Sequence, residues 1–242
     1  MKSLNVTPLQ TEIFRRGQDL HDFIVNAVPR SVISEKMVLC VTSKIVSLAE
    51  GRCIHRSQVT SKSNLVLQEA DVFLGEIGYG CFLTVKEGLF IASAGIDESN
   101  SENGDYILFP KNPQMSAQTL WTRLRESWTL HDLGILLTDS HTSPLRQGVT
   151  GVALGYWGFR AVRDMIGSKD IFGRELKMTK MNFADGLASA AVMMMGEGSE
   201  RQPLAVIHGA DLDFCDQVDT KEIRMPLEED LYFPMIRPFM EG

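Results

Sequence analysis

Three acidic residues stand at the ends of apolar runs, each beside a glycine or a hydroxyl residue. They are Asp97 in AGIDESN, Asp139 in LLTDS and Glu197 in MGEG. A carboxylate at the end of a buried strand is energetically costly unless another group compensates its charge. Mg²⁺ and Mn²⁺ prefer oxygen ligands and would compensate it. The three acids are therefore candidate metal ligands, and the hydroxyl of Ser140 is a further candidate.

Each acid taken alone also has a purely structural explanation. An aspartate that follows a strand commonly caps a helix or makes an Asx turn. Gly196, in the MGEG stretch, is typical of a helix C-cap. Gly196 and Gly198 would equally let backbone N–H groups approach a phosphate, although the chain contains no GxxxxGK[ST] loop. The residues alone leave both explanations open.

Four other polar residues are candidates for contacts with substrate. Lys44 interrupts an apolar run and Arg146 follows a proline in a polar loop, so each could bind phosphate or make an exposed salt bridge. Asn100 could hydrogen-bond to a nucleotide base or phosphate. His141 invites a general-base role, but no Ser/His/Asp order or Cys/His pairing supports it. We expect His141 to be a loop residue that can touch substrate.

The composition limits the class of protein. The 242 residues include 24 Lys and Arg against 31 Asp and Glu, for a net charge of -7. This balance argues against general binding to nucleic acid or to anionic membranes, since both need basic surface. No apolar run approaches the roughly 20 residues of a membrane span. Four scattered cysteines and no signal-peptide core indicate a reduced, cytoplasmic protein.

Apolar periodicity predicts the elements that must position these residues. Helices are expected over residues 17–29, over 116–130 with Ser116 as N-cap, and over 185–198 up to a stop at Gly196, with the run Met193, Met194 and Met195 in the core. Residues 95–105 have no period and are expected to form a polar loop. Strands are expected over these ranges: 37–48 with a break near 42–44, 81–96 as a hairpin around 86–88, 133–139, and 203–207.

The mixed order of helices and strands predicts the fold class. It favours an α+β fold with mixed sheets and flanking helices over a strict doubly wound fold. Residues 151–159 fit a strand or a helix, because their glycines oppose a helix and their apolar run permits a strand. We expect one unit over residues 1–242, with two subdomains that meet near 110–115, where Pro110 and Pro113 punctuate the chain.

Five segments together resemble one family. They are VLCVTSKIVSLAEGR, ASAGIDESN, LLTDSHTSPLRQGVTGVALGYWGF, DIFGRELKMT and MMMGEG. They occur in the order and rough spacing of the CofE-like γ-glutamyl ligases, whose founding members use GTP to add L-glutamate to the deazaflavin coenzyme factor 420. The resemblance covers nearly the whole chain and is strongest to a bacterial branch described as folate-metabolism γ-glutamate ligases. It implies a CofE-like fold and a homodimer.

The resemblance implies a role for each matching position. Asp97 and Asp139 would bind divalent cations, and Ser140 and Glu197 would bind the second of them. Asn100, together with Ser43 and its neighbour Lys44, would contact the nucleotide. The sequence departs from the family where Leu48 replaces a frequent lysine, where LQTEIF replaces an N-terminal G-I-P, and where HTSP replaces G-R-P. The last change places the identity of the acceptor in doubt.

The activity implied by the resemblance is formation of an amide between L-glutamate and a carboxylate of a factor 420 precursor or a folate-like acceptor. GTP or ATP would activate that carboxylate as an acyl phosphate, with two Mg²⁺ or Mn²⁺ ions, and with K⁺ as a further candidate ion. Lys44 and Arg146 would stabilise phosphate or carboxylate charge. Two alternatives remain: a metal-dependent phosphohydrolase, and a nucleotide or coenzyme binder without catalysis.

Overall fold

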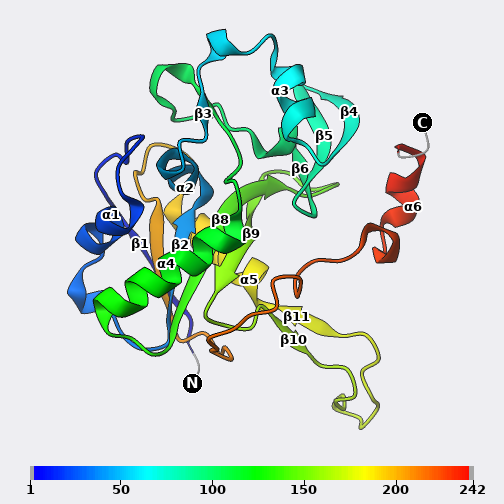
Figure 1. Cartoon of the computed structure of the whole chain (residues 1–242). Coiled ribbons are helices and arrows are strands. Elements are labelled where there is room, and N and C mark those ends of the chain that lie inside the picture. Colours follow the sequence, from blue (N-terminus) through cyan, green and yellow to red (C-terminus); the bar gives the residue numbers. More distant parts are fainter. Residues whose placement is uncertain (1–2, 240–242) are drawn as a thin grey trace.

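The computed structural model describes residues 3–239 and has an α+β fold, as the sequence predicts. Its centre is a five-stranded mixed sheet (Figure 1). Strands β2 and β8 run parallel, and every other neighbouring pair is antiparallel. The strands in spatial order are β1 (Asn5–Leu9), β12 (Leu204–His208), β2 (Met37–Thr42), β8 (Leu133–Thr142) and β9 (Val149–Trp157).

Helices cover both faces of this sheet. Met37, Leu39 and Val41 of β2 face one core, which α1 (Leu20–Ala27), α2 (Ser43–Ala49) and α4 (Pro113–Trp128) complete. Val38 and Cys40, which alternate with them, face α5 (Phe183–Met195) on the other side. The near-continuous apolar run of β2 therefore reflects burial on both faces, as is usual for strands with parallel neighbours.

The chain between α2 and α4 builds a second layer of structure, which we call the insert (residues 50–112). Its own core includes Leu65, Phe82 and Tyr106. Ile91 and Phe109 of the insert pack with β9, so the insert lies over the end of the main sheet (Figure 1). Its elements are β3 (Cys53–Ile54), α3 (Lys62–Glu69), β4 (Val72–Gly78), β5 (Cys81–Lys86), β6 (Leu89–Ala92) and β7 (Tyr106–Ile107).

The expected boundary near residues 110–115 falls where the chain leaves the insert and enters α4. Independent folding of two subdomains stays a prediction.

Two further segments lie outside the main sheet with its helices and outside the insert. A ribbon of β10 (Val162–Asp164) and β11 (Lys180–Asn182) extends away from the body, and a C-terminal segment leads to α6 (Phe233–Ile236) (Figure 1). Short 3-10 helices occur at Arg30–Val32, Arg56–Gln58, Ser93–Gly95, Glu102–Gly104, Leu227–Glu229 and Arg237–Phe239.

Several predicted element ends are confirmed, and two expectations are wrong. Residues 43–48 were expected to continue the strand after a break, but they belong to α2, because the chain turns into a helix at Ser43. Strand β2 ends at Thr42, and α5 ends at Met195, followed by Gly196 with a φ of 81°. The expected cap of α4 at Ser116 is wrong, because the Asn112 side chain accepts the N–H of Met115 and caps the helix one turn earlier. Pro113 suits the first turn, since it has no N–H to satisfy and its φ is already helical.

Three further expectations are corrected or decided. The strand expected over 133–139 continues to Thr142, because pairing with β9 extends it, so His141 lies on a strand and not in a loop. Residues 151–157 form a strand. The methionine run of α5 is only partly in the core: Met195 is buried, but Met193 is 76% and Met194 44% exposed. None of the described helices combines the length and the apolar character that a membrane span requires.

Candidate active site

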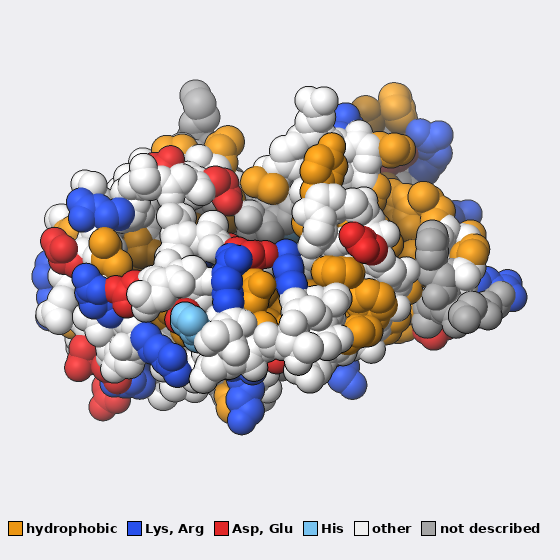
Figure 2. Space-filling view, turned by 90° about the horizontal axis from the view of Figure 1, so that it is seen from above, with side chains coloured by type: hydrophobic (Ala, Val, Ile, Leu, Met, Phe, Trp, Pro, Cys, Tyr) orange, Lys and Arg blue, Asp and Glu red, His pale blue; other side chains and the backbone are white. Residues whose placement is uncertain are grey.

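A cavity of about 680 Å³ opens between the main sheet, the insert and the loop after α5. Figure 2, which views the molecule from the side of the insert, shows a hollow with acidic and basic side chains beside it. Segments far apart in the sequence line this cavity. The predicted site residues among its walls are Ser43, Lys44, Asp97, Asn100, Asp139, Ser140, Gly196, Glu197 and Gly198.

Strand β8 delivers two of these residues to opposite sides. Successive side chains of a strand point to opposite faces, so Asp139 and its neighbour Ser140 diverge. Asp139 hydrogen-bonds with Ser43, the first residue of α2. Ser140 hydrogen-bonds with Glu197, which follows α5. A bulge in the pairing with β9 lies between Leu137 and Thr138, at the point where the strand enters the cavity wall.

Asp97 is held by the backbone of the insert and by Lys44. Its N–H and C=O exchange hydrogen bonds of 2.9 Å with Ile107. The Nζ atom of Lys44 lies 2.7 Å from Oδ2 of Asp97 and 2.9 Å from the carbonyl of Ser99. The N–H of Ser99 donates to Oδ1 of Asp97 at 2.7 Å. Burial works to raise the pKa of Asp97, but Lys44 and Ser99 outweigh burial and lower that pKa.

Within the described part of the chain, Asp139 and Glu197 have no ion pair like that of Asp97 with Lys44. Burial, aided by the charge of Asp97, raises the pKa of Asp139 to about 7, against the opposing effects of Ser140, Ser43 and Lys44. Burial also raises the pKa of Glu197, with Ser140 and Lys44 opposing and Asp97 and Glu200 reinforcing the shift. The positive charge of one lysine therefore does not compensate the acids of this cavity, and an added cation would.

The oxygen donors of this cavity do not form one tight cluster of acids. Among the described residues, Asp97, Asp139 and Glu197 do not bring their carboxylate oxygens within 4.8 Å of one another as a single cluster. Glu197 hydrogen-bonds with Ser140, and the charge of Asp97 acts on both Asp139 and Glu197. The hydroxyl of Thr138, which also lines the cavity, is buried without a hydrogen-bond partner. All of these donors are oxygens, which suits Mg²⁺ or Mn²⁺.

Two loops meet where a nucleotide is expected to bind. Asn100 has a left-handed φ of 51°, and its side-chain amide donates to the carbonyl of Gly198 at 3.2 Å. The N–H of Gly198 donates in turn to Glu200 at 2.8 Å. This contact ties the loop of residues 95–105 to the loop after α5. Nucleotide contacts from Asn100 and the two glycines stay predictions.

Comparison with known proteins identifies the family. A profile of the family described as "F420-0:Gamma-glutamyl ligase" matches residues 8–209. The chain belongs to this family. It is 35% identical over 219 residues to the "Coenzyme F420:L-glutamate ligase" of Methanopyrus kandleri, covering 84% of each chain. It is 32% identical over 248 residues to the protein of the same name from Methanocaldococcus jannaschii, covering 96% of this chain and 97% of the relative. For the Archaeoglobus fulgidus protein of that name, identity is 33% over 236 residues, with 90% and 92% covered.

Within this γ-glutamyl ligase family member, one predicted residue lies apart from the others. Arg146 is exposed in the loop between β8 and β9, where its N–H donates to Ser143 at 3.2 Å, and it does not line the cavity. Sequence reasoning missed Arg201, which does line the cavity and adopts a left-handed φ of 55°. Its position three residues after the MGEG stretch was the available signal. It also missed the buried hydroxyl of Thr138.

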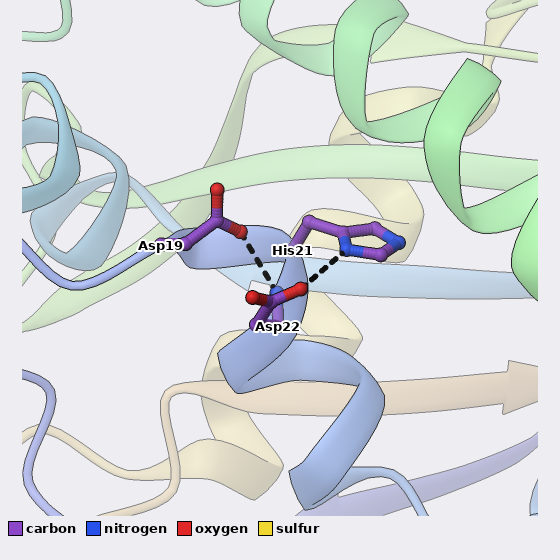
Figure 3. A group of neighbouring side chains, drawn as sticks. All are labelled: Asp19, His21 and Asp22. Atoms are coloured by element: carbon purple, nitrogen blue, oxygen red, sulfur yellow. Dashed lines mark hydrogen bonds and ion pairs between the residues drawn. The ribbon is translucent and has the colours of Figure 1, made fainter.

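A second group of possible metal ligands has a structural explanation. Asp19, His21 and Asp22 bring ligand atoms within 4.8 Å at the start of α1 (Figure 3). Asp19 caps the helix by accepting the N–H of Asp22 at 2.9 Å and pairs with Arg123 at 3.2 Å. His21 contacts Asp22 through Nδ1 at 3.0 Å and Ser127 through Nε2 at 2.8 Å. These protein partners account for the cluster as a helix cap, and none of its members lines the cavity.

Proposed function

We propose that this γ-glutamyl ligase joins L-glutamate to a carboxylate of a coenzyme-type acceptor and uses GTP or ATP to do so. One observation carries the proposal: oxygen donors from β8, the insert and the loop after α5 meet around one cavity in which the acids exceed the available positive charge. Phosphoryl transfer needs such an arrangement, because its catalysis depends on positioning and on charge neutralisation.

The proposed chemistry follows from the weakness of a carboxylate as an electrophile. An oxygen of the acceptor carboxylate attacks the γ-phosphorus of the nucleotide, the bond to the β–γ bridging oxygen breaks, and the nucleoside diphosphate leaves. The α-amine of L-glutamate then attacks the acyl carbon, phosphate leaves, and the amine loses a proton. The sequence of steps forms one amide and converts one GTP or ATP into the nucleoside diphosphate and phosphate. It requires no covalent attachment to the protein.

In this proposal each group of oxygen donors has a role. Asp97 and Asp139 hold one divalent cation, Ser140 and Glu197 hold the second, and bound Mg²⁺ or Mn²⁺ supplies charge neutralisation for the phosphoryl group. A monovalent ion such as K⁺ is a further candidate at the same cavity. We assign Ser43, Lys44, Asn100, Gly196 and Gly198 to the nucleotide. Lys44 keeps its ammonium group at the cavity wall, where it can also face phosphate.

The proposed acceptor is a factor 420 precursor or a folate-like compound. The named relatives are factor 420 ligases, which supports the first. Residues 141–144, HTSP, replace the G-R-P motif of the family at the end of β8 and in the loop that follows. This difference in sequence supports an acceptor other than the factor 420 precursor. Arg146 lies in the same loop but outside the cavity lining, so a role for it toward carboxylate charge on the acceptor stays a prediction.

A homodimer is part of the same proposal. The ribbon of β10 and β11 extends from the body, and an isolated two-stranded ribbon is marginally stable by itself. Ile171 and Phe172 in its loop are 92% and 77% exposed, and Leu231 in the C-terminal segment is 79% exposed. Figure 2 shows hydrophobic side chains gathered on the side where that segment lies. A second copy of the chain would cover these side chains.

A cytoplasmic location stays a prediction.

The experiment is a substrate matrix. Purified protein is incubated with GTP or ATP, with Mg²⁺ or Mn²⁺, with and without L-glutamate, and with the factor 420 precursor or folic acid. Phosphate release and product mass are measured. The proposal expects phosphate release that requires both glutamate and acceptor, and a product heavier by one glutamate residue. Phosphate release independent of both would indicate a phosphohydrolase, and nucleotide binding without turnover would indicate a non-catalytic binder.

A further inference from the structure

A part of the cavity that the proposed mechanism does not use lies at the end of β8. His141 stands two residues beyond Asp139, so the two side chains leave the same face of the strand, about 7 Å apart along it. His141 lines the cavity. Its Nδ1 atom is buried and has no hydrogen-bond partner. A buried nitrogen without a partner costs free energy, unless a ligand supplies the missing hydrogen bond.

Apolar side chains surround the same end of the cavity. Phe90 on β6 is 38% exposed and Val149 on β9 is 46% exposed, and both line the cavity. Strand β6 lies against β8, and Val149 pairs with Thr142 directly after His141. Val149 shares the face of the sheet with Thr142, opposite to His141, so the wall near His141 combines the exposed ring of Phe90 with the imidazole itself. Ligand sites commonly have this composition, in which apolar walls bind and a few polar groups orient.

We propose that His141 and Phe90 form the acceptor subsite of the ligase, in which Phe90 packs against a flat ring system and Nδ1 of His141 hydrogen-bonds to its polar edge. This inference rests on the proposed ligase function and specifies which residues select the acceptor. The distance from Asp139 suits it, because the carboxylate that receives phosphate would lie at the metal ligands and the rest of the acceptor beyond them.

The nucleotide is assigned elsewhere for a geometric reason. The candidate nucleotide residues Asn100 and Gly198 lie on two loops that contact each other. His141 and Phe90 instead come from β8 and β6. The two groups belong to different elements, and we assign the nucleotide to the first group and the acceptor to the second. A subsite beyond the metal ligands leaves the amine of glutamate free to approach the activated carboxylate.

The test compares the Michaelis constants of four variants with those of the unsubstituted protein. His141→Phe keeps a flat ring and removes Nδ1, His141→Asn keeps a polar atom near the Nδ1 position, and Phe90→Ala removes the ring. His131→Phe is the control, because His131 is exposed, precedes the opposite end of β8 and does not line the cavity. The acceptors are the factor 420 precursor without glutamate and folic acid. Thermal unfolding confirms that each variant is folded.

We expect His141→Phe and Phe90→Ala to raise the KM for the acceptor at least tenfold, with the KM for GTP and for glutamate changed less than threefold. His141→Asn should stay within threefold of the unsubstituted protein. An unchanged acceptor KM in His141→Phe, or a rise in the KM for GTP in its place, overturns the inference while the ligase function stands. If the unsubstituted protein makes no product, the proposed function fails. Equilibrium dialysis of both acceptors then decides the subsite: weaker binding to folded His141→Phe supports it, and equal or no binding overturns it.

Discussion

Asp139 and Ser140 are consecutive residues of β8 whose side chains serve opposite sides of the strand. Asp139 contacts Ser43 at the start of α2, and Ser140 contacts Glu197 behind α5. The alternation of a single strand therefore distributes oxygen donors to two places in one cavity. A helix would place consecutive residues about 100° apart, which would not separate the two donors in this way. This relationship is the structural basis for expecting two cation sites.

Substitution of one oxygen ligand should weaken one cation site and leave the other intact. We expect two Mn²⁺ ions per chain by isothermal titration calorimetry. Glu197→Gln should weaken one of them at least tenfold and leave the other within about threefold, because the second group of ligands is intact. Asp22→Asn is the control, since Asp22 belongs to the helix cap and does not line the cavity. A single binding event in the unsubstituted protein would contradict the two-site assignment.

The raised pKa of Asp139 makes the stability of the metal-free protein depend on pH. The pKa rises from 3.8 to about 7 on folding, so the folded state binds the proton more tightly than the unfolded state does. This contribution to the free energy of unfolding is fully present below pH 3.8 and is lost as the pH rises through about 7. Asp139→Asn carries no titrating group and should lose this dependence.

Thermal unfolding in EDTA between pH 5 and pH 8 measures this effect. The Tm of the unsubstituted protein should fall relative to that of Asp139→Asn across the range, so that the substituted protein becomes the more stable one at pH 8. Saturating Mg²⁺ should reduce the difference, because a bound cation favours the ionised carboxylate. Parallel pH curves for the two proteins in EDTA would show that Asp139 does not titrate in this window.

Lys44 should matter more for turnover than for binding of glutamate. Its ammonium group contacts Asp97 and Ser99 at the cavity wall, where it can stabilise charge on the transferred phosphoryl group. Lys44→Met should lower kcat about 100-fold, the usual effect of removing one charge-stabilising donor. Lys111→Met is the matched control, because Lys111 is exposed and outside the cavity lining. Turnover of Lys44→Met within threefold of the control would exclude this role.

The close packing of α5 on β9 should be sensitive to one methyl group. A Cβ atom at Gly151 would lie 2.2 Å from the carbonyl oxygen of Ala188, so the helix must shift. Gly151→Ala should destabilise the protein by about 2 kcal/mol or more and impair the Glu197 site at the end of α5. Gly186→Ala, within α5, meets no atom within 4 Å and should stabilise by up to about 1 kcal/mol. Urea unfolding measures both, and equal stabilities would contradict the packing argument.

Local signals predicted much of this structure, and long-range pairing accounts for most of the errors. Gly196 marks the end of α5 because only its freedom at positive φ suits that position, and the sequence reveals this directly. His141 was expected in a loop, because its polar neighbours carry no strand pattern. Pairing with residues 149–157 nonetheless extends β8 through it. Asn112 replaced Ser116 as cap because both fit locally and Pro113 decides between them.

In the candidate site, too, local signals identified the residues, and long-range contacts decide how they are arranged. Asp97, Asp139 and Glu197 were singled out from their positions at the ends of apolar runs, and the structure places all three at one cavity. The contact of Glu197 with Ser140 depends on which face of β8 meets which loop. The separate position of Arg146 depends on how the loop after β8 leaves the sheet. Contacts across a hundred residues are not encoded in any local pattern.

The central claim is that acids of this cavity support a ligation that depends on nucleotide and glutamate. The most direct measurement is the turnover of Asp139→Asn beside the unsubstituted protein, by product mass and phosphate release at saturating Mg²⁺, GTP, L-glutamate and acceptor. The account predicts that the unsubstituted protein forms one glutamyl amide for each phosphate released. It also predicts that Asp139→Asn, folded by thermal unfolding, turns over at least about 100-fold more slowly. Turnover of folded Asp139→Asn within threefold of the unsubstituted protein would contradict the claim.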